Sequence, residues 1–531
     1  MATSKVINLL VGKSAKGKYP AVQGSELSVN MYRGDNGGVQ FLESIPGLKR
    51  LFQINGKCRG TYVSTRGLDS ERSKEDMFAA MGNTVYRLKE NEKQKLFNIA
   101  PGSQRVCFAE TGGPTPIMLC TDGYNLHSYN LSTGEYRQVQ LPIAVEQDGH
   151  LVKPSHVAVI DGSIVINDTD SGYCYYSIRY PLASPTREVF DLLDGQVQYE
   201  ADGITVKKKT VDSYDWTFYD NYHTQLFFLS TGSSDCVNGL ISVGNYLYVF
   251  GPKSVEVKSY QGAEYATWSD LYFSAQSSFG LESPNSLCKV GNTVFFLSSG
   301  QQRGKCIMAV TGTQFEVVSD QWLDEKLESE VTDTAYMFPY STSHHMFVVL
   351  QANTIKETWC YDLSTKEWHQ RTSRDHNSGL ENQWRVGGVA YWREKFYAFT
   401  NDGLFCLFEG FMEQWKDDVE MPVIRHRQGA VFTSDNRPFI LEELALECNV
   451  GTCDDQLARP EVLLEVSKDG GMTFGNTRST SFGLTGEYSH RVRWHALGMT
   501  RLAVIRITFS EPMDFVLTDC DIRAARTGAM V

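Results

Sequence analysis

The sequence Gly82-Asn83-Thr84-Val85-Tyr86 combines a turn with the start of a β-strand. Gly and Asn favour a tight hairpin turn, and the alternation of polar and apolar residues after them favours an extended chain with one buried face. Stretches of the same kind recur along the chain: Asp122-Gly123-Tyr124, Asp161-Gly162-Ser163-Ile164-Val165, Gly244-Asn245-Tyr246-Leu247-Tyr248, Gly291-Asn292-Thr293-Val294-Phe295 and Asn401-Asp402-Gly403-Leu404-Phe405. The sequence is therefore predicted to fold mainly into β-strands.

The spacing of these stretches predicts how the strands are organised. The first three begin about 40 residues apart, and those at Gly244 and Gly291 begin about 47 residues apart, which is the length of a four-stranded propeller blade. Segments 129–136 and 361–368 also share a strand end, a polar turn and an aromatic residue. Because one blade cannot cover both of its faces, several blades must stack around an axis. We predict an all-β fold with a β-propeller of about six or seven blades.

The regular spacing is interrupted between Cys174 and Leu240 and is lost after Asp418. The first interruption fits either a degenerate blade or an inserted subdomain, and the sequence leaves both open. Beyond the second, a separate set of strands between Phe439 and Arg523 indicates a small β-sandwich. The predicted domains are an amino-terminal arm or platform segment over 1–60, the propeller over 61–420 with a possible insertion at 174–240, and a carboxy-terminal β-sandwich domain over 436–531.

The composition limits the classes of protein that fit. Of the 531 residues, 41% are hydrophobic and 21% are charged, which excludes a mostly disordered or fibrous chain. The 63 acidic residues outnumber the 50 basic ones, and the formal charge of −13 gives no overall attraction to DNA or to an anionic membrane. Residues 1–10 lack the pattern of a secretory signal, and no run approaches the apolar length of a membrane-spanning helix. The 12 cysteines are scattered, as expected of reduced and mostly buried thiols.

The most specific local motif is an Asp-box, the S-x-D-x-G-x-T-[W/F] pattern of sialidase-like propellers. Its residues are Ser467, Asp469, Gly471, Thr473 and Phe474. The Ser and Asp side chains are expected to hydrogen-bond the backbone of a hairpin turn while the aromatic ring packs beneath, so we predict a structural role. A sialidase would also need three arginines that converge on a carboxylate and a Tyr–Glu pair as nucleophile, which this motif does not supply.

Other motifs give no reason to expect catalysis. Gly12-Lys13-Ser14 lacks the earlier glycine of a phosphate-binding loop, because position 7 is Ile7. Cys448 and Cys453 have no second pair at zinc spacing, and His344-His345 would point to opposite faces of a strand. We therefore predict a protein that is not an enzyme and has no catalytic, cofactor-binding or metal site.

Basic residues gather near the carboxy terminus at Arg491, Arg493 and Arg501. In a strand, Arg491 and Arg493 would share one face while Trp494 pointed to the other, as in a packed sheet with one polar side. This pattern favours salt bridges at a subunit interface over recognition of nucleic acid.

Three blocks of the chain resemble one protein family in their residues and their order. They are Val29-Asn30-Met31-Tyr32 with Phe41-Leu42-Glu43-Ser44-Ile45-Pro46-Gly47-Leu48 and Asn55-Gly56-Lys57-Cys58-Arg59-Gly60; then Phe250-Gly251, Ser254, Glu256, Gly262-Ala263, Leu271-Tyr272 and Gln276; and last Arg491-Val492-Arg493-Trp494-His495-Ala496-Leu497-Gly498, Arg501 and Asp519-Cys520-Asp521-Ile522-Arg523. In these blocks the chain resembles the packaged-DNA stabilisation proteins, which are the tail-hub or nozzle proteins of short-tailed (podovirus) bacteriophages.

The resemblance implies a structural component of the virion tail that is assembled in the host cytoplasm. It implies a homo-hexameric ring below the portal-adaptor (head-to-tail connector) that extends the DNA channel, retains packaged DNA and gates its release. The implied partners are the adaptor, a tail needle or plug, tailspikes or fibres, and double-stranded DNA that passes through without specific contact. A propeller would supply a stiff wedge for such a ring, and an acidic lumen would limit adhesion of the duplex.

The alternative is a glycan-binding or sialidase-like propeller protein. In that case some of the 26 Tyr, 28 Phe and 9 Trp residues would contact sugars. Aromatic residues at alternating strand positions are usually part of the core, which favours the tail protein. Glycan binding or hydrolysis by the purified monomer would favour the alternative.

Overall fold

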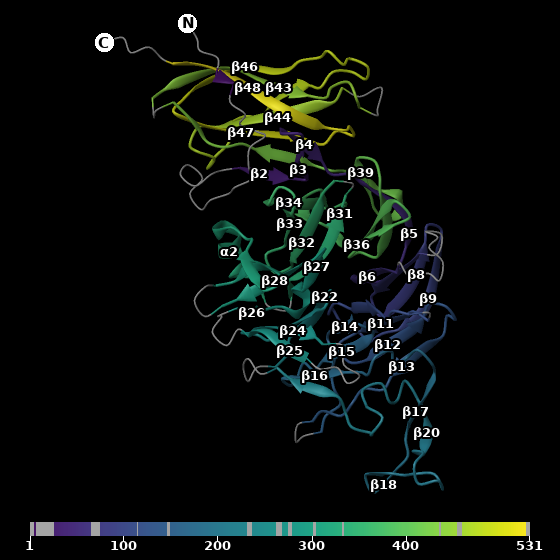
Figure 1. Ribbon diagram of the computed structural model, residues 1–531. Helices are drawn as coiled ribbons and strands as arrows, with labels where there is room; N and C mark the ends of the chain where they lie inside the picture. Colours follow the sequence, from purple (N-terminus) through teal and green to yellow (C-terminus); the bar gives the residue numbers. More distant parts are fainter. Residues whose placement is uncertain are drawn as a thin grey trace.

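The computed structural model describes residues 5–6, 26–64, 75–113, 115–145, 149–230, 236–261, 268–273, 279–300, 304–331, 334–342, 344–434, 437–453 and 459–526. Within them the chain folds into a β-propeller and a β-sandwich that lie side by side (Figure 1). The prediction of an all-β fold with these two domains is confirmed.

The propeller has seven blades in the described part of the chain, where the sequence predicted six or seven blades. Blades one to three are β6 (Cys58–Ser64), β7 (Asp76–Met81), β8 (Thr84–Lys89) and β9 (Glu92–Asn98); β10 (Cys107–Glu110), β11 (Ile117–Thr121), β12 (Leu126–Asn130) and β13 (Tyr136–Val139); and β14 (Val157–Ile160), β15 (Ser163–Asn167), β16 (Tyr173–Tyr176) and β21 (Phe227–Leu229). Blades four and five are β22 (Gly239–Val243), β23 (Tyr246–Phe250), β24 (Val255–Tyr260) and β25 (Trp268–Phe273); and β26 (Gly280–Leu281) with β27 (Cys288–Val290), β28 (Thr293–Ser299), β29 (Cys306–Thr311) and β30 (Gln314–Val317). Blade six is β31 (Tyr336–Ser341), β32 (Met346–Ala352), β33 (Glu357–Asp362) and β34 (Glu367–Arg374), and it follows the short helix α2 (Gln321–Leu327).

The seventh blade takes strands from both ends of the propeller sequence. Three of them are β36 (Val386–Trp392), β37 (Lys395–Thr400) and β38 (Leu404–Phe408). The fourth is β5 (Leu48–Gln53), which pairs with β38 in antiparallel register and so closes the ring. Blade one begins directly after β5, and β36 contacts β6. This closure leaves no unpaired blade at the seam.

Apolar side chains between neighbouring blades form the core. Every residue of β11 and β15 is buried, because the middle strands of a blade are covered by other blades on both faces. Phe78 and Met118 pack between blades one and two, for example, and Phe250 packs on Phe296 between blades four and five, with ring centroids 4.9 Å apart. Blade stacking therefore buries the faces that a single blade would leave exposed.

An insertion interrupts blade three between its third strand, β16, and its fourth, β21. It contains the hairpin of β17 (Thr186–Phe190) and β20 (Lys208–Asp212), which carries the smaller hairpin of β18 (Leu192–Leu193) and β19 (Gln196–Val197). The region 174–240 thus contains parts of a regular blade as well as an inserted subdomain. The insertion lies at the end of the molecule opposite the sandwich (Figure 1).

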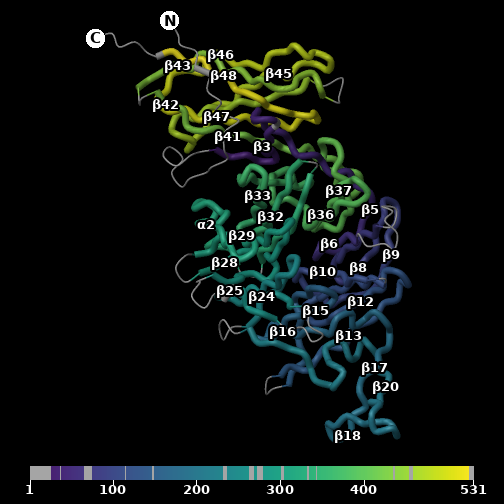
Figure 2. Tube along the Cα trace, in the orientation of Figure 1, coloured from purple at the N-terminus to yellow at the C-terminus, as the bar shows by residue number. Residues whose placement is uncertain are grey.

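The sandwich is built from two sheets around one apolar core that includes Trp494 and Phe515. One sheet contains β3 (Met31–Asn36), β4 (Val39–Ser44), β48 (Val516–Arg526), β43 (Phe439–Cys448) and β46 (Val492–Thr500), with β1 (Lys5–Val6) paired to β48. The other contains β41 (Arg425–Gln428), β47 (Leu502–Phe509), β44 (Glu461–Ser467), β45 (Arg478–Ser481) and β42 (Phe432–Thr433). The strands nearest the two chain ends, β1 and β48, therefore meet in this domain (Figure 2).

One continuous sheet joins the two domains. Strand β2 (Leu27–Val29) pairs with β34 of blade six on one side and with β41 of the sandwich on the other, so the blade and the sandwich sheet form a single 11-stranded sheet that also includes β35 (Glu381–Gln383). Strands β39 (Met412–Gln414) and β40 (Glu420–Pro422) lead from blade seven to β41. The expected arm over 1–60 is accordingly divided, because β5 completes the propeller and β3 and β4 belong to the sandwich. The sandwich starts at β41, before the predicted 436, because β41 pairs with β47 of the sandwich sheet.

Candidate functional site at the domain junction

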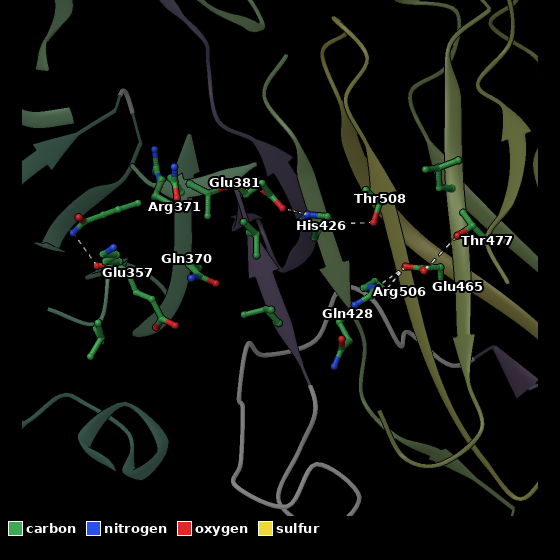
Figure 3. Close-up of a pocket in the computed structure, with 18 residues that line it drawn as sticks. Glu357, Gln370, Arg371, Glu381, His426, Gln428, Glu465, Thr477, Arg506 and Thr508 are labelled. Carbon is green, nitrogen blue, oxygen red and sulfur yellow. Dashed lines mark hydrogen bonds and ion pairs between the residues drawn. The ribbon is translucent and has the colours of Figure 1, made fainter. Parts of the chain in front are cut away.

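A groove of about 630 Å³ crosses the shared sheet where the propeller meets the sandwich (Figure 3). Strands β34 and β35 form its propeller side, and β41, β44 and β47 form its sandwich side. Residues of both domains therefore line this groove.

Charged pairs connect the strands that line this groove. His426 Nε2 lies 2.8 Å from Glu381 Oε2, and its Nδ1 lies 2.8 Å from Thr508 Oγ1, so one imidazole connects β35, β41 and β47 (Figure 3). Burial raises the pKa of Glu381, but the hydrogen bond and charge of His426 outweigh it and leave that pKa lowered. On the sandwich side, Arg506 Nη2 is 2.7 Å from Glu465 Oε2. The contact between His426 and Glu381 joins the two walls of the groove, and the pair of Arg506 and Glu465 stabilises the sandwich wall.

Beneath the groove, Asn30 joins three distant segments of the chain. Its Nδ2 donates to the Ile424 carbonyl at 2.8 Å and to Thr372 Oγ1 at 2.9 Å, and its Oδ1 accepts from the Thr372 amide at 3.0 Å. Asn30 is 1% exposed and has a φ of 57°, in the left-handed region that Asn tolerates better than most residues. The side chain therefore holds β2, blade six and the start of the sandwich in one register.

Two buried arginines lie close to Asn30 in the same sheet. Arg371 is surrounded by the rings of Tyr340, Phe347 and Trp384, with its guanidinium carbon 5.1 to 5.4 Å from their centroids. Arg427 donates to Ser28 Oγ at 2.9 Å, and burial lowers its pKa to about 10. Cation–π contacts and burial of this kind favour one fixed geometry. If these contacts were lost, a charged guanidinium would remain in an apolar interior without a compensating partner.

A second cavity, of about 1140 Å³, lies on the propeller axis and is lined by the innermost strands of all seven blades. Arg105 is the one arginine among its described lining residues, and its Nη1 donates to the Gly387 carbonyl at 2.8 Å. Glu110 accepts a hydrogen bond from Tyr62 at 2.9 Å, and burial lowers the pKa of His156 to about 4, which leaves it neutral at pH 7. The described walls thus lack the three-arginine cluster of a sialidase.

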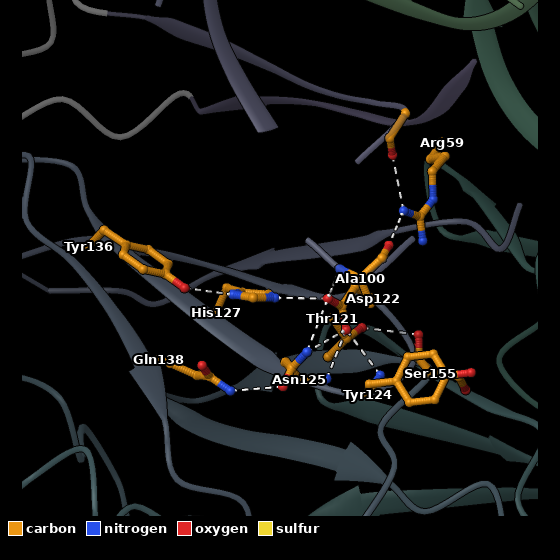
Figure 4. A network of polar contacts seen from close by, with 11 residues as sticks. Arg59, Ala100, Thr121, Asp122, Tyr124, Asn125, His127, Tyr136, Gln138 and Ser155 are labelled. Carbon is orange, nitrogen blue, oxygen red and sulfur yellow. Dashed lines mark hydrogen bonds and ion pairs between the residues drawn. The ribbon is translucent and has the colours of Figure 1, made fainter. Parts of the chain in front are cut away.

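A buried carboxylate locks blade two to the linker that precedes it (Figure 4). Asp122 accepts from the Ala100 amide at 2.7 Å and lies 3.0 Å from His127 Nε2, and His127 Nδ1 lies 3.1 Å from the Tyr136 hydroxyl. Arg59 donates to the Ala100 carbonyl at 2.7 Å. Burial raises the pKa of Asp122, but the hydrogen bonds from His127 and three backbone amides lower it well below its usual range.

The same turn position carries an acid in two further blades. Asp168 of blade three lies 3.0 Å from His150 Nε2, and Asp402 of blade seven pairs with Arg385 at 2.7 Å. In these three blades, the turn that follows the second strand therefore contributes a carboxylate that connects it to the linker before the blade. This arrangement stiffens the propeller.

The Asp-box forms a turn after β44. Asp469 accepts from the Met472 and Thr473 amides at 3.0 and 2.9 Å, and Ser467 Oγ accepts from the Gly471 amide at 2.8 Å. Hydrogen bonds from the Ser467 and Thr473 hydroxyls, together with those from the Thr473 and Met472 amides, lower the pKa of Asp469 well below its usual range. Phe474 packs on Arg506 at the sandwich side of the groove. The guanidinium carbon of Arg506 lies 3.8 Å from the centroid of the Phe474 ring.

The three arginines singled out in the sequence lie at or next to β46. Arg493 Nη1 is 3.4 Å from Glu443 Oε1 on the adjacent strand, whereas exposed Arg491 and Arg501 form no ion pair with any described residue. The structure does not bring these three side chains together into one site. Asn30, Arg371 and Arg427, which build the junction, were not identified as site residues, because only the folded sheet brings their strands together.

Several further observations concern predicted absences. In the part of the chain that the structure describes, no group of three His, Cys, Asp or Glu side chains is placed to hold a metal ion. Searched over the same ranges, no helix has the length and apolar character needed to cross a membrane. Gly12-Lys13-Ser14, Gly262-Ala263 and Gln276 lie outside the described residues.

Comparison with protein families gives two matches. The family model described as bacteriophage P22 Gp10, β-propeller, matches residues 212–399, and the one described as bacteriophage P22 Gp10, β-sandwich, matches residues 425–525. The first match covers the later part of the propeller and the second covers the sandwich from β41 onward, and together they confirm the predicted family resemblance. A comparison with curated proteins finds no match.

Solved structures resemble the chain only distantly. The amino-terminal domain of Nup159 is 11% identical, with a TM-score of 0.37 over 72% of this chain and 98% of that one. The extracellular domain of the hybrid two-component system BT4673 from B. thetaiotaomicron is 10% identical, with a TM-score of 0.36, and the match covers 68% of this chain but 40% of that one. A chain of the nidogen–laminin complex is 12% identical, with a TM-score of 0.29 over 55% and 91% of the two chains. Likenesses at this level indicate nothing about function.

Proposed function

The chain belongs to the packaged-DNA stabilisation family of bacteriophage P22 Gp10, and from that premise we propose that it forms the nozzle of a short-tailed phage. Six copies would form a ring below the portal-adaptor, extend the DNA channel and retain the packaged DNA. The observation that carries the proposal is the match to both Gp10 domains, at 212–399 and 425–525, in a chain whose two domains share one sheet.

The shared sheet suits a subunit of a closed ring. A ring of identical copies uses two different surfaces of each subunit, and it closes only if the subunit holds a fixed shape. The junction at Asn30 and Arg371 supplies that fixed shape, because hydrogen bonds and buried charges specify one register between the domains. A tightly packed subunit would also transmit the pressure of packaged DNA with little deformation.

The DNA would pass through the central channel that the six copies enclose. The DNA would not pass through the axial cavity of a single propeller, because the volume of that cavity, about 1140 Å³, is far smaller than the volume of one turn of duplex DNA. Arg105, which lines the cavity, is also hydrogen-bonded to Gly387 of blade seven. The net charge of −13 would favour passage of the duplex over adhesion to the lumen, since like charges repel. Specific phosphate contacts are not needed for a conduit.

The proposed partners are the portal-adaptor, a tail needle or plug, and tailspikes or fibres. The protein would be a non-enzymatic component of the virion tail that is assembled in the host cytoplasm. Its work would be mechanical, namely closing the filled head and letting DNA leave when the plug is released.

Retention of DNA tests this function directly. Phage in which the gene for this chain is disrupted should fill their heads but lose nuclease-protected DNA, and the wild-type chain supplied in trans should restore protection. The exposed substitution Asn382→Asp should restore it as well, because Asn382 lies at the surface of the same sheet. Heads that keep their DNA without the chain would contradict the proposal.

A further inference from the structure

The insertion of blade three ends in a compact tip, residues 191–206, which we call the fingertip. It sits beyond the β17–β20 hairpin, at the end of the molecule farthest from the sandwich (Figures 1 and 2). Nothing in the propeller requires this extension, since β16 and β21 pair directly across its base.

The fingertip is ordered by its own backbone. Asp194 and Gly195 have φ values of 48° and 77°, as in the two-residue turn that joins β18 to β19. The Glu200 amide donates to the Thr205 carbonyl at 2.7 Å, and Asp202 Oδ1 accepts from the Thr205 amide at 2.8 Å. Local hydrogen bonds therefore set its shape.

The fingertip has no core of its own. None of residues 191–206 is buried, and Leu193, Tyr199 and Ile204 are 62%, 53% and 82% exposed. Large apolar side chains that an ordered element leaves exposed within so short a segment are typical of a protein interaction surface. Tyr is enriched among the residues that dominate binding, and such an anchor contributes most when a partner's pocket excludes water around it.

The charge of the fingertip has a single sign. Asp191, Asp194, Glu200 and Asp202 lie within it, and residues 191–206 contain no Lys or Arg, whereas the exposed lysines at 207–209 lie at its base. A negative rim around apolar anchors is complementary to a positive rim around an apolar pocket. The four carboxylates disfavour contact with nucleic acid or an anionic membrane.

The base of the insertion holds the fingertip at a fixed place on blade three. Val189 is 1% exposed, and the ring of Phe190 packs edge-on against Tyr222 with centroids 4.7 Å apart. Phe218, also 1% exposed, joins the core between blades two and three. A surface held in place before binding loses little conformational entropy when it binds.

We propose that the fingertip docks into an apolar pocket, rimmed by Lys or Arg, on a different protein of the assembled tail. Leu193, Tyr199 and Ile204 enter the pocket, and the four carboxylates face its basic rim. This inference rests on the proposed function for the identity of the assembly, whereas the docking chemistry rests on the fingertip alone.

Site-specific crosslinking tests the inference in phage-infected cells. The full-length chain carries the photoreactive residue p-benzoylphenylalanine in place of Tyr199, and a matched control carries it in place of Tyr246, which is 38% exposed on blade four. Irradiation should link position 199 to one polypeptide other than this chain, at apolar residues flanked by Lys or Arg, and position 246 should not give that product.

Two variants separate the charge from the apolar anchors. Asp191→Asn, Asp194→Asn and Glu200→Gln together should lower the crosslink yield about fivefold or more, since they remove the complementary charges while leaving the turns intact. Leu193→Ser with Ile204→Ser should lower it at least as far. An unchanged yield in the charge variant would overturn the proposal, as would crosslinks to a second copy or to nucleic acid, or no crosslink above the control.

The outcome also separates this inference from the proposed function. A chain that is present in purified virions but gives no fingertip crosslink would overturn the docking and leave the nozzle intact. A chain that is absent from virions but gives the expected crosslink in infected cells would overturn the nozzle and support the docking.

Discussion

The domain junction and the fingertip are held in place in opposite ways, the first by contacts between distant parts of the chain and the second by contacts within one short segment. At the junction, β2, β34 and β41 come from three distant parts of the chain, and Asn30 is buried between them. In the fingertip, one short continuous segment forms two small hairpins, and no residue is buried. The junction is therefore coupled to the stability of the whole fold, whereas the fingertip is nearly independent of it.

This difference indicates where substitutions should change folding and where they should change only interactions. Long-range contacts with buried polar groups contribute to one cooperative structure. Local hairpins with exposed side chains can be altered at little cost to stability. A nozzle needs both kinds of region, since it must bear load and also meet partners.

The largest effect is expected for Asn30→Leu. The substitution removes the hydrogen bonds to Thr372 and Ile424 and places a γ-branched side chain at a φ of 57°. We expect the free energy of unfolding to fall by about 4 kcal/mol, from unsatisfied buried groups and backbone strain. Urea denaturation measures the change, and the exposed Asn382→Asp serves as the control. A loss below about 1 kcal/mol would show that the junction is not coupled to the fold.

The second effect depends on pH and comes from Glu413 on β39. This side chain is 2% exposed, and burial raises its pKa from 4.5 to about 7 despite the nearby Arg385. Its contribution to stability is thus fully present below pH 4.5 and is lost as the pH rises through about 7.

Glu413→Gln should therefore make the protein more stable than wild type at pH 8, by up to about 3 kcal/mol, with no difference below pH 4.5. Denaturation across pH 4.5 to 8 measures this dependence. The exposed Glu409→Gln is the control, because Glu409 pairs with Lys49 at the surface. A parallel pH profile for Glu413→Gln and wild type would contradict the assignment.

A smaller effect is expected for the groove pair of His426 and Glu381. Both side chains are partly exposed, at 25% and 32%, so solvent screens their interaction. A double-mutant cycle with His426→Gln and Glu381→Gln should give a coupling energy of about 0.5 to 1 kcal/mol that decreases in high salt. A coupling energy of zero would show that this pair does not help to hold the junction together.

The smallest effect on stability is expected at the fingertip. Leu193→Ser, Tyr199→Ser and Ile204→Ser should each change the free energy of unfolding by less than about 0.5 kcal/mol, because these side chains are exposed. Phe218→Ala at the base of the insertion should cost about 3 to 5 kcal/mol. If a fingertip variant unfolded as readily as the Phe218 variant, the contrast between the two regions would fail.

The sequence predicted those parts of the fold that are encoded locally. Turn signals such as Gly82-Asn83 and Gly291-Asn292 marked the blades, because in each case the turn directly joins two paired strands. The sequence could not fix the blade number, since the seventh blade depends on β5 pairing with β38 from the far end of the propeller. The Asp-box was recognisable for the same local reason, as all its bonds lie within one turn.

The junction could not be predicted, because its residues meet only in the folded sheet. Val29-Asn30-Met31-Tyr32 carried the family resemblance, but no pattern along the chain shows that Asn30 bonds to Thr372 and Ile424. The fingertip did carry a visible signal, the hairpin dipeptide Asp194-Gly195, within a region that was left open between blade and insertion.

Cryo-electron microscopy of the virion tail tests the central claim most directly, namely that propeller and sandwich form one rigid subunit of the nozzle ring. The account predicts this chain as a six-fold ring between the portal-adaptor and the tail tip, with the 11-stranded sheet continuous in every copy. Absence of the chain from the tail, or its presence as a peripheral fibre with the two domains separated, would contradict it.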